Sequence, residues 1–517
     1  MITINNNFFR KDSLHILIIF IPFFEFYSAN FFEFEKHSFF YFCFFSIILI
    51  FLTFFFIKII NFIFKKNLTL TISIFFFLIF KYLLIKNIFS NFAFTKDIDG
   101  EVSLLFIFML SFLVSKFANR INYNLVEKFI IFYLLLHLII LFPKIIYINK
   151  NDFLRINKSE LVNNQDYNNI KNTKNIYYVV LDGMTSIESF EEFYDFKLSD
   201  FKTFINKENL FYSEGHTAYP NTMYNFTSLL NLDYIVDEKS DPLINRSLMY
   251  PYSMRENLIN NYNLLKFLKK IDFNLKWEGS AHPGNCYNYN IDICINKKKA
   301  SKIQLIRNNF YIIDSFLSLT PIFSITTRLN IYNPYNKLYD IHKLHDSIGN
   351  LMNNLKSLDL EKKNYFFLIH HMSPHNPFVF KKDCSKREIN SLLNDRDLEG
   401  FKESYLCALK KIEELYFFVQ KYDPEAILVF QGDHGWNFNH DNRNSINIEF
   451  YNPNTFNLIV APKKCTKDIS KEYLNMINTA RIVLGCSINK KIKMVPTKRF
   501  FTYPTNDKNY GKVFLIK

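Results

Sequence analysis

The chain has 517 residues, of which 18% are aromatic and 21% are charged, and its formal net charge is +14 at pH 7. This length exceeds what one hydrophobic core usually serves, so we expect two or more structural units. The sequence contains neither a dense block of Lys and Arg nor a nucleic-acid-binding motif, so nucleic acid is not an expected partner. The abundance of Phe, Ile, Asn and Lys indicates a coding bias instead.

The first part of the chain, residues 1–149, is predicted to be a transmembrane helical domain. Its long Phe/Ile/Leu runs approach the roughly 20 residues that cross a bilayer. They predict five spans, at approximately Leu14–Ser28, Ser38–Phe64, Leu68–Ile85, Val102–Phe117 and Phe129–Tyr147. No small-residue cleavage site follows the first span, so it is not expected to be a cleaved signal peptide.

Basic residues beside the spans predict the orientation, because Lys and Arg normally flank the cytoplasmic ends. They gather on one side of the predicted spans: Arg10, Lys11, Lys58, Lys65, Lys66, Lys116, Arg120 and Lys128. The N-terminus is therefore expected in the cytoplasm, and everything after Tyr147 outside it, as in an inner-membrane protein with a periplasmic domain. Within the spans we expect no paired charges, since Glu25 and Lys81 are isolated in the sequence, and a transport path is disfavoured.

Residues 150–174 are rich in Asn, Lys and Asp and are predicted to form a juxtamembrane linker. From residue 175 to 517, short apolar runs alternate with helical patterns, which is typical of an α/β domain. Three runs, Ile176–Leu181, Tyr365–Ile369 and Ile427–Phe430, are apolar on both faces and predict central strands. Apolar positions at helical spacing predict a helix over Leu406–Leu415. We therefore expect a mixed or parallel sheet between helix layers.

Seven cysteines are present, and Cys43 lies in an apolar run. The other six fall in the part predicted to be extracytoplasmic, where disulfides persist. Cys286 and Cys294 are expected to close a small loop, with free buried thiols as the alternative.

Three acidic or imidazole side chains follow predicted strands. Asp182 comes directly after the first strand, and Asp433 and His434 come after the third, between two glycines that allow a tight turn. Carboxylate oxygen and imidazole nitrogen suit a divalent cation, and ligands gather at strand ends in open α/β sheets. The alternatives are a helix cap for Asp182 and a structural turn for the other two. We predict one divalent metal ion, with Mn, Zn and Mg all fitting.

Thr222 follows Pro-Asn at the expected start of a helix, where free N–H groups favour a phosphate-like anion. Its hydroxyl is either an N-cap or, beside a metal, a nucleophile and metal ligand. Thr227 and Ser228 are the competing hydroxyls further into the helix. The second predicted strand leads into His370 and, between two prolines, His375, which suits contact with a substrate oxygen or protonation of a leaving group.

At these residues the chain resembles the alkaline phosphatase superfamily in its sulfatase-like branch, and in particular the membrane-anchored phosphoglycerol transferases (lipoteichoic acid synthase type) and phosphoethanolamine transferases. The resemblance implies an alkaline-phosphatase-like three-layer α/β/α domain. It places one catalytic cation on Asp182, Thr222, Asp433 and His434, and substrate contacts on His375 and His370.

The resemblance also implies an upstream substrate-binding histidine, for which His282 is the candidate. Two features depart from the family. Close transferases usually carry glutamate where Asp182 stands, and the Cys/Ser-x-Pro-x-Arg motif of true sulfatases is absent.

The expected function is metal-dependent transfer of a phosphoglycerol- or phosphoethanolamine-type headgroup from a membrane phospholipid to an envelope glycan or lipid through a phospho-threonine. The alternatives are a phosphodiester or sulfate-ester hydrolase of the same fold and a non-catalytic membrane binding protein.

Overall fold

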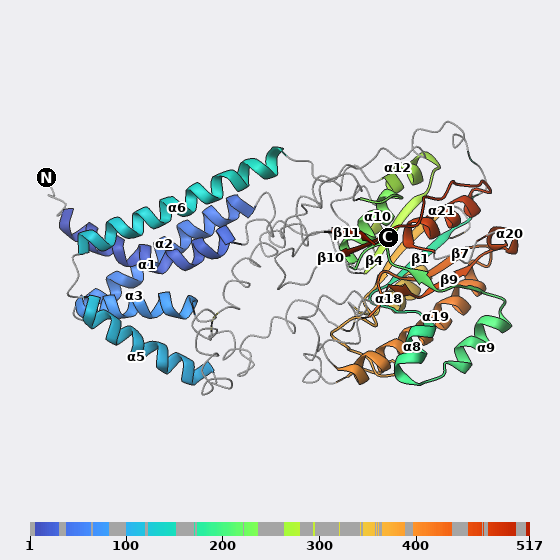
Figure 1. The fold of residues 1–517 in the computed structure, drawn as a ribbon, viewed down its shortest axis with the longest axis horizontal. Coiled ribbons are helices and arrows are strands. Elements are labelled where there is room, and N and C mark those ends of the chain that lie inside the picture. Colours follow the sequence, from blue (N-terminus) through green and yellow to red (C-terminus); the bar gives the residue numbers. More distant parts are fainter. Residues whose placement is uncertain are drawn as a thin grey trace. The chain divides into compact units, whose positions relative to one another are not determined.

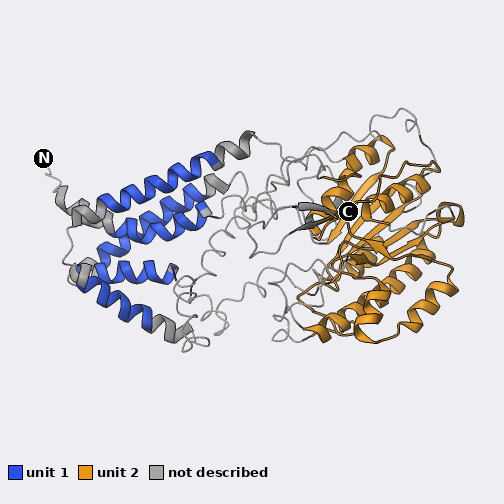
Figure 2. Cartoon of the chain, in the orientation of Figure 1, with its two compact units in different colours: residues 1–151, 300–334 blue, residues 152–299, 335–517 orange. Residues whose placement is uncertain are grey.

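The computed structural model covers the full chain, and its described residues are 6–29, 38–63, 66–81, 100–118, 123–150, 173–220, 222–235, 263–279, 293–294, 345–356, 364–387, 397–436, 453–467, 474–502 and 513–516, with isolated positions 170, 320, 342, 358, 360 and 469. The chain divides into two compact units, residues 1–151 with 300–334 and residues 152–299 with 335–517 (Figure 2). The predicted linker, His282 and the predicted Cys286–Cys294 pair lie largely or wholly outside the described residues.

The first unit is helical in its described part. Its helices are α1 (Asn6–Ala29), α2 (Ser38–Ile63), α3 (Lys66–Phe80), α5 (Gly100–Ala118) and α6 (Tyr123–Lys150). Each overlaps one predicted span (Figure 1). Among the described residues, only the Phe42–Ile59 stretch of α2 is long and apolar enough to cross a membrane by length and composition. The other four helices carry shorter apolar stretches, and the five-span arrangement stays a prediction.

A cluster of polar side chains lies within this helical unit. Lys81, directly after α3, forms an ion pair with Glu25 of α1, and the Tyr133 hydroxyl of α6 donates to the other oxygen of the same carboxylate. The Glu25 side chain is 14% exposed and that of Lys81 is 26% exposed. The expectation that the spans lack paired charges is therefore wrong. Residues separated in sequence meet because α1 packs against both α3 and α6.

The second unit is built on a mixed seven-stranded sheet with the order β2-β9-β7-β1-β6-β4-β5. Its strands are β1 (Ile176–Leu181), β2 (Phe211–Tyr212), β4 (Asn274–Gly279), β5 (Ile293–Cys294), β6 (Tyr365–His371), β7 (Ile427–Gly432) and β9 (Asn457–Val460). The five strands β7, β1, β6, β4 and β5 run parallel, whereas β9 pairs antiparallel with β7 and β2 pairs antiparallel with β9. All three predicted strands are confirmed.

Helices cover both faces of this sheet. Side chains of β1 alternate between two apolar cores: Tyr178 lies in one and Tyr177 in the other. The first core contains residues of α10 (Thr222–Asn231), α12 (Asn263–Lys270) and α21 (Met476–Ser487). The second contains residues of α8 (Ile187–Tyr194), α9 (Ser199–Lys207), α18 (Ser347–Leu355) and α19 (Leu398–Tyr422). The expected helix, sheet and helix layers are confirmed.

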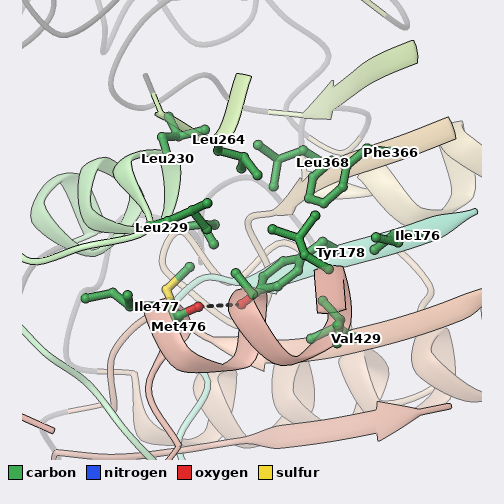
Figure 3. Close-up of a cluster of buried hydrophobic side chains, with 14 of the residues drawn as sticks. Ile176, Tyr178, Leu229, Leu230, Leu264, Phe366, Leu368, Val429, Met476 and Ile477 are labelled. Carbon is green, nitrogen blue, oxygen red and sulfur yellow. Dashed lines mark hydrogen bonds between the residues drawn. The ribbon is translucent and has the colours of Figure 1, made fainter. Parts of the chain in front are cut away.

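The first core holds α10 and α21 against the sheet (Figure 3). Tyr178 is fully buried among Leu229, Leu230, Val429 and Met476. Its hydroxyl donates to the Gln431 side-chain oxygen at 2.6 Å and lies 3.1 Å from the Met476 carbonyl. A buried tyrosine hydroxyl needs a hydrogen-bond partner. The contact with the Met476 carbonyl therefore links β1 to α21, in addition to the apolar packing between them.

Smaller elements and two disulfides complete the unit. The short pairs are β3 (Gly215–His216) with β8 (Asn454–Thr455) and β10 (Arg499–Thr502) with β11 (Val513–Ile516), and α20 (Lys463–Thr466) precedes α21. The disulfides are Cys384–Cys407 and Cys465–Cys486, neither of which the sequence predicted individually. Cysteine spacing does not encode pairing, because partners are set by the fold.

Replacing Lys81 by Met should destabilise the helical unit, because the largely buried Glu25 carboxyl group then loses its counter-charge. We expect a loss of about 1–3 kcal/mol, measured by thermal unfolding of the full-length protein in detergent. The double exchange Glu25→Lys with Lys81→Glu should recover most of that loss.

The matched control is Lys116→Met on α5, since Lys116 is exposed and its Nζ lies 5.9 Å from the Phe112 ring, without an ion pair to any described residue. Equal unfolding temperatures for Lys81→Met and Lys116→Met, with no recovery in the double exchange, would show that the pair contributes nothing.

Candidate metal centre and nucleophile

The candidate site lies at the carboxyl ends of three adjacent strands. In the sheet register Leu181 of β1 pairs with His371 of β6 and with Gly432 of β7. The next residues along the chain, Asp182 and Asp433, are therefore neighbours at one edge of the sheet. Gly432 has a steric reason to be glycine, since a Cβ there would lie 2.1 Å from the Met184 carbonyl oxygen.

Asp433 is held by backbone groups through only one of its carboxylate oxygens. Its Oδ1 accepts hydrogen bonds from the Gly183 N–H at 2.9 Å and the His434 N–H at 2.8 Å. Its Oδ2 is buried and accepts no hydrogen bond from the described residues. His434 Nε2 lies 3.6 Å from Oδ2. A buried carboxylate oxygen of this kind is costly unless a cation or proton meets it.

Asp182 is the shared member of the cluster, with a side chain that is 3% exposed. Its Oδ2 lies 3.2 Å from His370 Nε2, and its Oδ1 lies 3.5 Å from His434 Nε2. Burial by itself would raise the pKa of this carboxyl. The neighbouring imidazoles of His375, His370 and His434 outweigh burial and hold the pKa well below its usual value. Asp182 is therefore a carboxylate at neutral pH.

Thr222 opens helix α10, as the sequence predicted. Its Oγ1 lies 3.2 Å from His434 Nε2 and 3.4 Å from Asp182 Oδ1. Thr227 and Ser228, which carry the competing hydroxyls, lie further along α10 and are fully buried. Thr222 is thus the hydroxyl of α10 that reaches the carboxylate and imidazole cluster, at the helix end where the dipole favours an anion.

His434 presents one defined nitrogen to the cluster. Its Nδ1 lies 3.2 Å from the Gly435 carbonyl, which can only accept, so Nδ1 carries a proton and Nε2 is left to Asp182 and Thr222. Burial would lower the pKa of this imidazole, but the adjacent carboxylates of Asp433 and Asp182 raise it to about 9. Burial also raises the pKa of Asp433.

The two ring nitrogens of His375 also have different roles. Its Nδ1 donates to the Asn376 carbonyl at 2.7 Å, leaving Nε2 as the acceptor or proton carrier. The ring stands edge-on to His434, with centroids 6.2 Å apart, and to Trp436, at 5.8 Å. Trp436 stacks on Phe401 at 4.9 Å, so the indole backs His375 from a rigid core.

Two positions here were missed from the sequence. Trp436 immediately follows the Gly-Asp-His-Gly string, and that adjacency is the signal that could have found it. Gly183 adopts φ +70°, and a Cβ there would contact Trp436 at 3.5 Å and His375 at 3.6 Å. A Cβ at these distances would be in ordinary contact, so it is the left-handed backbone conformation that favours glycine beside Asp182.

His370 lies deeper than the sequence suggested. Strand β6 continues through it to His371, so the His370 ring is fully buried, edge-on to Phe226 at 4.6 Å. It reaches Asp182 from the core side. His371 points to the opposite core, and burial lowers its pKa to about 3, as it does for the nearby His345. These two imidazoles are neutral at physiological pH.

The residues present fit a divalent cation. Asp182, His375 and His434 bring ligand atoms within 4.8 Å of one another, and so do Asp182, His370 and Asp433. The Asp433 Oδ2 atom, without a hydrogen-bond donor among the described residues, is the observation that favours an ion. Oxygen and imidazole donors suit Zn or Mn, and the carboxylates suit Mg as well. Of the predicted cluster, Asp182, Thr222, Asp433, His434, His375 and His370 are brought together, and His282 is outside the described residues.

Metal affinity should rise with pH. A pKa of about 9 keeps His434 protonated in the ion-free protein, and a metal ligand must be deprotonated, so binding releases a proton. We expect the Mn²⁺ affinity to increase about tenfold per pH unit from pH 6 to pH 8, measured by calorimetry in buffers of different ionisation enthalpy. An affinity that is constant over this range, with no proton released, would contradict the assignment. His434→Gln should lower the affinity and flatten its pH dependence.

No family model matches the sequence, and no curated protein matches it. Solved structures do. The integral membrane protein lipooligosaccharide phosphoethanolamine transferase A (EptA) from Neisseria meningitidis is 14% identical, with 91% of this chain and 95% of that one covered and a TM-score of 0.39. The zinc complex of the C-terminal periplasmic domain of EcEptC from Escherichia coli is 12% identical, with 67% and 93% covered and a TM-score of 0.38.

The lipoteichoic acid synthase LtaP from Listeria monocytogenes is 11% identical, with 71% of this chain and 91% of that one covered and a TM-score of 0.35. These likenesses concern the fold alone.

Proposed function

We propose that the chain is a metal-dependent enzyme that transfers a phospho-headgroup, of the phosphoglycerol or phosphoethanolamine type, from a membrane phospholipid to an envelope glycan or lipid. The supporting observation is the position of the Thr222 hydroxyl. It lies at a helix N-terminus within 3.4 Å of both Asp182 and His434. A hydroxyl among carboxylate and imidazole ligands suits nucleophilic attack on phosphorus.

The ion site is formed by Asp182, Asp433 and His434, with Thr222 beside it. A bound divalent cation there would ease ionisation of the hydroxyl and offset negative charge on the phosphate oxygens. The chain's own residues orient the hydroxyl. Thr222 Oγ1 lies 3.2 Å from His434 Nε2 and donates toward Asp182 Oδ1 at 3.4 Å, so the Asp182 carboxylate accepts its proton and returns it when Thr222 is freed.

In the first step Thr222 Oγ1 attacks phosphorus, and the bond from phosphorus to the diacylglycerol-like alcohol breaks. His375 Nε2 donates a proton to the departing oxygen, and its ring is held by the Nδ1 bond to Asn376 and by Trp436. In the second step His375 Nε2 takes the proton of the acceptor hydroxyl, which attacks the phospho-threonine and frees Thr222. The same imidazole thus serves as acid and then as base.

The proposed setting is a membrane. Residues 1–149 would anchor the enzyme, residues 150–174 would link the parts, and residues 175–517 would form the extracytoplasmic catalytic domain. Apolar side chains such as Phe62 and Phe142 are exposed in the helical unit, at 92% and 64%. In water such exposure is costly, and in lipid it is favourable. A lipid donor suits an enzyme anchored in this way.

Replacing Thr222 by Ala should lower turnover at least about a thousandfold, because the nucleophilic oxygen is lost. Thr222→Ser keeps an oxygen and should retain measurable activity. In the unchanged protein, incubation with phospholipid should add the mass of the headgroup to the peptide that contains Thr222, as read by mass spectrometry of the full-length protein in detergent.

The matched control is Thr227→Ala, since Thr227 is a fully buried hydroxyl on the same helix. It should keep turnover within a few-fold. Full turnover in Thr222→Ala, in a protein that still folds and binds metal, would refute covalent catalysis at this residue. A binding-only role would then be the better interpretation.

Transfer is separated from hydrolysis by the acceptor. The purified full-length protein would be incubated with labelled phospholipid, with and without an envelope glycan or glycolipid. We expect the label to move to the acceptor and its release into water to be slow. Release of the headgroup only as a free product would establish a hydrolase of the same fold instead.

A further inference from the structure

The segment that delivers Thr222 to the site carries a bidentate side-chain bond. Asn225 lies one turn after Thr222 in α10 and is 1% exposed. Its Oδ1 accepts from the Tyr219 N–H at 3.1 Å, and its Nδ2 donates to the Tyr219 carbonyl at 2.6 Å. One amide side chain thus binds both the N–H and the carbonyl of Tyr219, and we call this pair of bonds the Asn225 clamp. The hydrogen-bonded ring that it closes includes Thr222.

Tyr219, the residue that the Asn225 side chain binds, is itself held by the core. Tyr219 is fully buried, and its ring stacks on Phe500 at 4.9 Å and on Tyr224 at 5.4 Å. Its hydroxyl accepts from the Ile235 N–H at 3.2 Å. Asn225 therefore ties the start of α10 to a point that the core already holds.

The clamped segment is also joined to the metal-ligand loop. The Thr217 hydroxyl lies 2.8 Å from the Asp433 carbonyl and is in hydrogen-bond contact with the Tyr219 carbonyl. Thr217 is buried, so this contact is shielded from water. The same backbone residue, Tyr219, thus connects Asn225 and the loop that carries Asp433.

From these contacts we propose that Asn225 is a positioning residue for the nucleophile: its clamp on Tyr219 sets the place of the Thr222 hydroxyl relative to the Asp182 and Asp433 carboxylates. The proposal rests on the proposed function, since it assigns a purpose to the clamp in that reaction. Asn225 is buried, and in this proposal it acts on Thr222 through its two bonds to the Tyr219 backbone.

The main test is Asn225→Ala in the full-length protein. A nucleophile displaced by about 1 Å loses about a hundredfold in rate, so we expect kcat to fall about a hundredfold and KM to change less than threefold. Amide hydrogen exchange supplies a readout that needs no turnover. The Tyr219 amide should exchange at least tenfold faster, because its acceptor is gone.

Asn231→Ala is the matched control. Asn231 lies on the same helix and is 2% exposed, but its Nδ2 donates to the Thr227 carbonyl within the helix. This variant loses a buried amide of equal size. We expect a similar fall in unfolding temperature, with kcat within twofold of the unchanged protein and no change at the Tyr219 amide.

Asn225→Asp separates the hydrogen bond from packing. The carboxylate keeps the shape of the amide but places an oxygen against the Tyr219 carbonyl, so it cannot donate. A protonated carboxyl can donate. The kcat of Asn225→Asp, divided by the kcat of the unchanged protein, should therefore rise as the pH falls. A purely structural role would not produce this pH dependence.

Equal losses of kcat in Asn225→Ala and Asn231→Ala, or a flat pH ratio for Asn225→Asp, would overturn the positioning role. Failure of the proposed function has a different signature, namely undiminished turnover in Thr222→Ala. In that case the Tyr219 exchange rate still decides whether Asn225 clamps the segment.

Discussion

Parallel pairing of β1 with β6 on one side and β7 on the other is the constraint on which the site depends. It brings Leu181, His371 and Gly432 into line, so the residues that follow meet at one edge of the sheet. Two carboxylates this close repel each other in a buried setting. The imidazoles around them, and an ion where one is bound, compensate for that repulsion.

Burial gives each group of the cluster a distinct electrostatic role. Asp182 stays ionised because imidazoles surround it, whereas the pKa of Asp433 is raised. One oxygen of Asp433 is committed to two backbone N–H groups, and the other is left for a cation. Division of a carboxylate in this way fixes its orientation, which a metal site requires of its ligands.

The two apolar cores, one on each face of the sheet, hold the residues of the site in a rigid arrangement. Tyr178 joins β1 to α21, and Asn225 joins α10 to the Tyr219 backbone. Trp436, stacked on Phe401, supports His375 from the other core. Polar contacts that are satisfied inside an apolar layer specify one geometry, because each broken partner leaves a costly buried group.

The sequence by itself determined the three central strands, their burial on both faces and the start of α10. Apolar runs and the Pro-Asn-Thr string are local signals for these features. It also determined which residue types could bind a cation at Asp182, Asp433 and His434. Only the tertiary structure decided that Glu25 meets Lys81, that His370 lies behind Asp182 and that Trp436 supports His375. Those contacts join segments far apart in the chain, and no local pattern encodes which distant surfaces pack together.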